Sequence, residues 1–122
     1  MSKEALLIFT KNPEAGKVKT RLAATIGDAE ALRVYKQLLM HTVSETNFMS
    51  ADKYVFYADY LDPDDIWNDK RYYKELQHGN DLGERMMNAF ASTFRKGYDK
   101  IIIIGTDCPS LDQSIINDAF SK

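Results

Sequence analysis

The sequence has 122 residues, a length that suits one domain built around a single hydrophobic core. Hydrophobic residues make up 44% and charged residues 28%, and the formal net charge of −2 argues against a general nucleic-acid binder. No stretch reaches the roughly 20 apolar residues of a membrane helix, and the N-terminal residues do not have the pattern of a signal peptide. With one cysteine no internal disulfide can form, so we expect a cytoplasmic domain without nucleic-acid or membrane partners.

The first half of the chain predicts a strand, a helix and a second strand. The short apolar run "ALLIF" at 5–9 is closed by a loop rich in Lys, Asn, Pro and Gly, which is typical of a buried strand. From Asp28, which we expect to cap it, a helix with one apolar face runs to about Thr46. The aromatic and β-branched residues of 53–60 favour a strand. A loop follows over 61–71, with one helical turn expected to begin at Pro63.

The second half begins with a weak strand and continues with a helix. The segment 72–76 is the weak strand. Asp81 and Glu84 stand at the spacing of a helix-capping box, which predicts a helix that starts there and ends at Gly97. Its expected inner stripe begins at Leu82 and continues at helical spacing.

The strongest strand of the chain is 100–104. Its four consecutive isoleucines leave no polar side, so both faces of the sheet should be covered at this strand, as in a parallel sheet. A last helix is expected after Asp112. The alternation of strands and helices predicts an α/β fold of three layers, a mainly parallel sheet with helices on both faces. We expect 1–122 to form a single α/β domain.

Two loops of this fold should meet. Ligands of such sheets bind beyond the carboxyl ends of the strands, where the strand order reverses. The loops at 10–20 and 105–111 both follow strands, and we expect them to face the same crevice.

Four cations occupy the first of these loops. They are Lys11, Lys17, Lys19 and Arg21. Gly16 would let a ligand approach the backbone closely, and Thr20 is expected to cap a short helix over 21–25. Cations beside a helix start favour a bound phosphate, and the alternative is a solvated basic loop. The stretch is no Walker A loop, because that motif needs Ser or Thr where Val18 stands.

Two further groups of residues are candidates for the site. Asp107 follows the isoleucine strand, where it is either a metal carboxylate or a turn-forming residue. Asp81 is explained well by helix capping alone. Arg85 in the first turn of the same helix faces either an acidic neighbour or an anionic ligand. Cys108 is interpreted as a small buried residue.

Three segments together resemble a known family. "FTKNPEAGKVKTRLA", "QHGNDLGERM" and "IIIIGTDCPSL" are similar to the signature stretches of a glycosyltransferase-like family in the nucleotide-diphospho-sugar transferase superfamily. The family has the GT-A fold, was long a domain of unknown function, and includes members named arsenosugar-biosynthesis glycosyltransferases. The resemblance spans nearly the whole chain, which would correspond to the N-terminal Rossmann-like part of that fold.

The resemblance implies a site for a nucleotide sugar. The residues that would bind the nucleotide and its diphosphate are Lys11, Gly16, Lys17, Lys19 and Arg21. Asp81 and Arg85 would lie near the base or ribose, or brace the loop that does. Asp107 would be the catalytic metal carboxylate, holding Mg²⁺ or Mn²⁺. The family's Asp-x-Asp pattern is broken here, because Pro109 stands where its second Asp would be.

The implied function is a nucleotide-sugar-dependent glycosyltransferase that stabilises charge developing on the leaving phosphates. Relatives continue with further strands that build the acceptor site, and no general base is evident in these residues. We therefore expect this form to dimerise through the apolar edge of strand 100–104, or to belong to a longer protein. The alternatives are a nucleotidyltransferase of the molybdenum-cofactor guanylyltransferase type, which would bind a nucleoside triphosphate, and a non-catalytic nucleotide-binding module.

Overall fold

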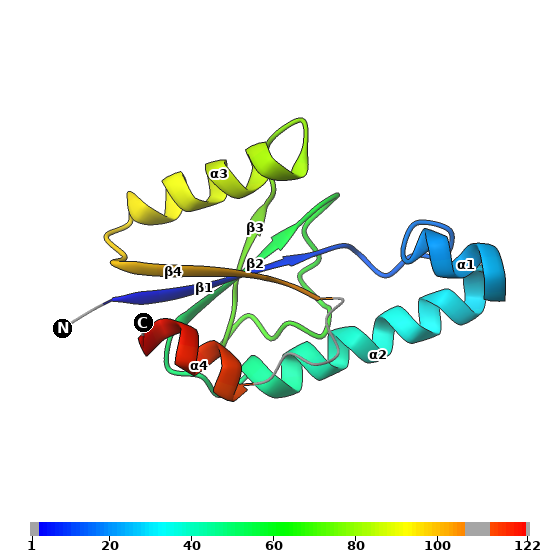
Figure 1. The fold of residues 1–122 in the computed structure, drawn as a ribbon, viewed down its shortest axis with the longest axis horizontal. Helices are drawn as coiled ribbons and strands as arrows, with labels where there is room; N and C mark the ends of the chain where they lie inside the picture. Colours follow the sequence, from blue (N-terminus) through cyan, green and yellow to red (C-terminus); the bar gives the residue numbers. More distant parts are fainter. Residues whose placement is uncertain (1–2, 107–112, 122) are drawn as a thin grey trace.

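Four parallel strands form one sheet through the centre of the molecule (Figure 1). The computed structural model describes residues 3–106 and 113–121. The strands lie in the order β3-β2-β1-β4, and their bounds are Glu4–Thr10 for β1, Asp52–Tyr57 for β2, Tyr73–Leu76 for β3 and Lys100–Gly105 for β4. In the register, Ile8 of β1 pairs with Val55 of β2 on one side and with Ile104 of β4 on the other. The predicted strands are therefore confirmed, and each neighbouring pair is parallel.

Helices cover both faces of this sheet. Their bounds are Thr20–Ile26 for α1, Asp28–Thr46 for α2, Leu82–Phe94 for α3 and Gln113–Ser121 for α4. Figure 1 shows α3 on one face of the sheet and α2 with α4 on the other. The predicted three-layer α/β fold is confirmed.

The alternation of side chains along β1 divides the core in two. Leu6 and Ile8 pack with α2 and α4, whereas Leu7 and its neighbours on the same side pack with α3. All three of these side chains are fully buried. Burying such a side chain contributes about 1.5–3 kcal/mol each, so β1 holds both layers of helices to the sheet.

The isoleucines of β4 are covered on both faces, as their pattern predicts. Ile102 and Ile104 pack against the α2–α4 side, while Ile101 and Ile103 pack against the α3 side. They are nevertheless only half-buried, because β4 is an edge strand of the described sheet, with β1 as its one neighbour there.

Four local expectations are wrong in detail. The second strand ends at Tyr57 rather than residue 60. No helical turn begins at Pro63, since the side chains of Asp62 and Asp65 accept bonds from the amides two residues on, which favours turns. Thr20 and Asp28 are the first residues of α1 and α2 instead of their caps, and neither helix has a side-chain cap.

The expected inner stripe of α3 also needs correction at its start. Leu82 is 63% exposed, whereas Ala89 and Thr93 further along the helix are buried as predicted. Leu82 opens the helix beyond the edge of the core, where it lines the cleft described below.

Candidate functional site

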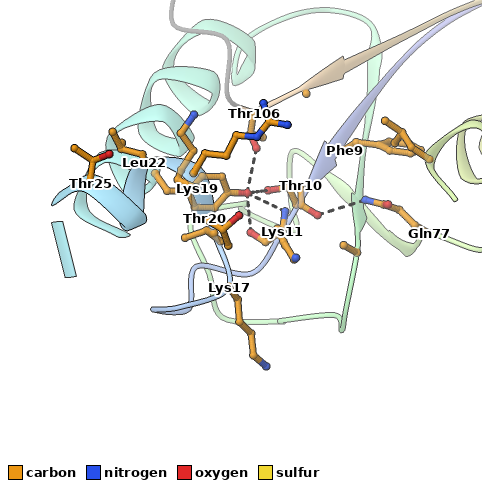
Figure 2. Close-up of a pocket in the computed structure, with 16 residues that line it drawn as sticks. Phe9, Thr10, Lys11, Lys17, Lys19, Thr20, Leu22, Thr25, Gln77 and Thr106 are labelled. Carbon is orange, nitrogen blue, oxygen red and sulfur yellow. Dashed lines mark hydrogen bonds between the residues drawn. The ribbon is translucent and has the colours of Figure 1, made fainter. Parts of the chain in front are cut away.

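A cleft of about 820 Å³ lies at the carboxyl ends of β1 and β4 (Figure 2). Its walls come from the ends of both strands, the loop after β1, and helices α1 and α2, with Gln77 and Leu82 closing one side. The two loops that were predicted to face one crevice do meet in the described part, because Thr10, Lys11, Gly105 and Thr106 all line it. The volume is within the range of small-molecule sites, which is roughly 300–1,000 Å³.

The hydroxyl of Tyr35 connects the carboxyl ends of β1 and β4 through hydrogen bonds. It accepts a hydrogen bond from the amide of Lys11 at 2.9 Å and donates one to the carbonyl of the same residue at 2.9 Å. Its oxygen also lies 3.3 Å from the hydroxyl of Thr10 and 3.2 Å from that of Thr106. Tyr35 is 5% exposed, so these bonds form away from water and set the spacing of the cleft walls.

All four predicted cations line the cleft. Lys17 forms an ion pair with Glu14 at 3.7 Å, and its side chain extends away from the other labelled groups in Figure 2. Among the described residues, no acidic side chain is within ion-pair distance of Lys11, Lys19 or Arg21. None of the described residues that line the cleft is acidic, so its electrostatic potential favours an anion.

The backbone of the cationic loop is fixed by two features. Val18 is 3% exposed and packs in the α2–α4 side of the core, which anchors the loop between Lys17 and Lys19. Lys19 itself has φ 49°, the left-handed conformation, directly before α1. A side chain in this conformation costs roughly 1–2 kcal/mol, so the loop keeps a strained lysine at the cleft.

Gly16 does not line the cleft, and its role is in the backbone conformation of the cationic loop. It has φ 82°, which favours glycine, and an added Cβ would meet a carboxylate oxygen of Asp28 at 3.5 Å, an ordinary contact. It is therefore the backbone conformation that requires glycine at this position.

Gln77 is held in place by Arg85. The side-chain nitrogen of Gln77, Nε2, donates to the carbonyl of Phe56 at 2.9 Å and to that of Thr10 at 3.4 Å. Arg85 donates to the Gln77 side-chain oxygen at 3.3 Å and to the carbonyl of Gly79 at 3.0 Å. Arg85 does not line the cleft, and its contacts instead brace the segment that carries Gln77.

Asp81 acts as the N-cap of α3. Its side chain accepts a hydrogen bond from the amide of Glu84 at 2.8 Å, as the capping spacing predicts. Glu84 accepts a bond from the amide of Asn80 at 3.3 Å, one residue earlier than the usual capping box. These contacts are structural, and Asp81 does not line the cleft.

Sequence reasoning missed three residues of the site. Tyr35 lies on the apolar face of the predicted helix 28–46, where a buried tyrosine needs a partner for its hydroxyl. Gln77 was quoted inside a signature stretch without a role, and Thr106 was passed over between Gly105 and Asp107. A polar residue just after a predicted strand was the available signal for both.

The metal site could not be located in the described residues. Within 3–106 and 113–121 there is no group of three His, Cys, Asp or Glu side chains that could hold a metal ion. Asp107, the predicted metal carboxylate, lies outside the described residues, as do Cys108 and Pro109. None of the described helices has the length and apolar character needed to cross a bilayer.

The fold of the chain is shared with a solved structure. The chain aligns with a protein from Desulfovibrio desulfuricans G20 that is described as a "putative nucleotide-diphospho-sugar transferase", with 30% sequence identity and a TM-score of 0.84. The alignment covers 99% of this chain and 54% of the other, so the chain spans about half the length of that protein. The predicted resemblance to nucleotide-diphospho-sugar transferases is thereby confirmed.

The family itself follows from the sequence of residues 39–122. These residues match the family described as "Uncharacterized protein conserved in bacteria (DUF2064)", and the chain belongs to that family. No curated protein matches the chain.

Proposed function

We propose that the cleft binds the diphosphate of a nucleotide sugar and that the chain is the nucleotide-binding part of a glycosyltransferase. The observation that carries this proposal is the gathering of four cations at the carboxyl ends of parallel strands, in a cleft whose described lining contains no acidic residue. The name given to the similar solved structure supports the same class of substrate. Because the chain spans about half of that structure, the acceptor and the complete reaction are also part of the proposal.

The described residues suit the charge that develops when a sugar leaves a nucleotide diphosphate. As the bond between the sugar carbon and the phosphate oxygen breaks, its electron pair passes to the diphosphate. Lys11, Lys19 and Arg21 would stabilise that charge because they have no acidic partner among the described residues. Arg21 can form two parallel hydrogen bonds to one phosphate, a geometry that lysine lacks.

Asp107 is the residue we propose to hold Mg²⁺ or Mn²⁺, with phosphate oxygens of the substrate as further ligands. The described lining supplies cations rather than carboxylates, so it would contribute little to such an ion directly. When bound, the metal would add positive charge beside the phosphates.

We also propose a cytoplasmic location, which the single cysteine supports.

A thermal-shift screen tests the proposal. The protein would be heated with UDP, GDP, CDP and ADP sugars and with the matching triphosphates, each with and without Mn²⁺. A ligand at about 100 times its Kd adds about 2.7 kcal/mol to the free energy of unfolding, a readily measured shift. We expect a shift with one diphosphate sugar, reduced in Lys19→Ala and in Arg21→Ala.

Lys70→Ala is the matched control, since Lys70 is exposed and lies before β3, away from the cleft. The thermal shift that the nucleotide gives in this variant should equal that of the wild type.

Pyrophosphate release from a triphosphate would instead indicate a nucleotidyltransferase. Binding without turnover when metal and acceptors are supplied would indicate a binding module. No shift with any nucleotide would contradict the proposal.

A further inference from the structure

A second cavity, of about 380 Å³, lies between α2 and the turns of residues 62–67. Apolar side chains dominate its walls: Pro13, Leu39, Met40, Ile66 and Trp67. It adjoins the nucleotide cleft, because Thr10 and Lys11 line both spaces. The proposed nucleotide site shares Lys11 with this cavity but uses none of its apolar walls.

Among the described residues that line the cavity, Asp65 is the one carboxylate, and it is already neutralised. Asp65 forms an ion pair with Lys74 at 2.9 Å, and both side chains are largely buried, at 13% and 11% exposed. Asp65 also accepts hydrogen bonds from the Tyr57 hydroxyl and from the amide of Trp67. Burial and the neighbouring Asp65 raise the pKa of Tyr57, so its hydroxyl stays protonated and keeps donating. This wall therefore neither repels an anion nor attracts a cation strongly.

Two lysines give the cavity its charge. Lys11 and Lys36 line it, both residues are exposed, and no acidic side chain among the described residues pairs with either. Lys36 and Met40 are one helical turn apart on α2, which sets a cation beside the apolar wall. An apolar interior with unpaired cations is complementary to a ligand that combines an apolar body with negative charge.

We propose that this cavity binds a small molecule with an apolar body and one anionic group. The body would pack against Leu39, Ile66 and Trp67, and the anion would lie near Lys11 and Lys36. The inference goes beyond the nucleotide site, because it needs neither a nucleotide nor a metal. A ligand bound here would lie directly beside the cleft that shares Lys11.

The only tryptophan of the sequence makes the cavity directly observable. Trp67 is 2% exposed and lines the cavity, so its fluorescence reports on occupancy. Three ligands share a cyclohexyl ring and differ in charge, so they separate the contribution of the anionic group to binding from that of the apolar body. They are cyclohexanecarboxylate, cyclohexylmethanol and cyclohexylmethylamine. Each would be titrated to about 10 mM without nucleotide while emission and melting temperature are recorded together. We expect a saturable change with the carboxylate, and binding at least about tenfold weaker with the alcohol and the amine.

Two variants locate the binding. Lys36→Glu and Met40→Glu both change exposed side chains at the cavity, and each should weaken carboxylate binding at least about tenfold. Lys70→Glu makes the same charge change as Lys36→Glu but lies away from the cavity, so it should leave carboxylate binding unaltered. The proposal is overturned if neither emission nor melting temperature responds to the carboxylate. It is equally overturned if the amine binds as tightly, or if all variants bind like the wild type.

Discussion

The hydroxyl of Tyr35 is the residue-scale feature on which the cleft depends. It bonds with both backbone groups of Lys11 and contacts the hydroxyls of Thr10 and Thr106. In Tyr35→Phe these partners, of which Thr10 and Thr106 are buried, lose their bonds, so we expect the free energy of unfolding to fall by about 1–3 kcal/mol and nucleotide affinity to fall with it. Urea denaturation and titration calorimetry would measure the two effects.

Tyr73→Phe is the matched control for this change. Tyr73 is 57% exposed and lies on β3, so removing its hydroxyl should alter stability by less than about 0.5 kcal/mol. If Tyr35→Phe were as stable as this control, the hydroxyl could not be what joins the two loops.

Tyr57 predicts how stability depends on alkaline pH. Burial, followed by the hydrogen bond to Asp65, raises the pKa of Tyr57 above the ordinary value of about 10. Above pH 10 the unfolded chain loses this proton while the folded chain keeps it, so the stabilisation is complete below pH 10 and is lost as the pH rises. One such group lowers the free energy of unfolding by about 1.4 kcal/mol per pH unit.

Urea denaturation between about pH 9 and 11 would measure that slope. We expect a shallower slope in Tyr57→Phe than in the wild type, because the variant has lost one of the groups that titrate. Equal slopes in the two proteins would show that Tyr57 does not titrate differently on folding.

At the scale of elements, the start of α1 combines strain with charge. Lys19 precedes this helix in the left-handed conformation and also lines the cleft. Glycine relieves such strain, so Lys19→Gly should raise the free energy of unfolding by up to about 1 kcal/mol while weakening nucleotide binding. Thermal unfolding with and without nucleotide separates the two effects. A variant that loses stability would show that the lysine is not strained.

The sequence predicted elements well where one pattern dominates. The isoleucine run of β4 and the apolar stripe of α2 leave a single reasonable interpretation, and both elements form as expected. Boundaries failed where local hydrogen bonds compete, as at Asp62 and Asp65, whose side chains favour turns over a helical turn at Pro63. Asp65 is also held by Tyr57 and Lys74, and the local sequence does not show that these two residues are its neighbours.

At the scale of the whole molecule, the order of strands accounts for the part of the site that could be predicted. Once β1 and β4 are neighbours, the loops that follow them must meet, and that much follows from the alternation of elements. Tyr35 and Gln77 reach the cleft only through three-dimensional packing of α2 and the segment after β3, so their roles needed the structure.

The edge strand β4 offers a surface along which two copies of the chain could associate. Its isoleucines are half-buried, and within the described sheet it has one neighbour. We propose that two copies pair along this edge, since an open apolar edge favours strand addition. Sedimentation velocity should then show dimers, and hydrogen exchange of β4 amides should slow with rising concentration while β3, the opposite edge, stays unchanged. A monomer at every concentration would contradict this pairing.

The central claim is that the cationic cleft binds a nucleotide diphosphate, and amide chemical shifts mapped by NMR test it most directly. On addition of the diphosphate that gives the largest thermal shift, we predict saturable changes in the amides of Lys11, Lys19, Arg21 and Thr106, with little change at β3. Those changes should be lost in Arg21→Ala. Saturable changes confined to another surface, or none at all, would contradict the claim.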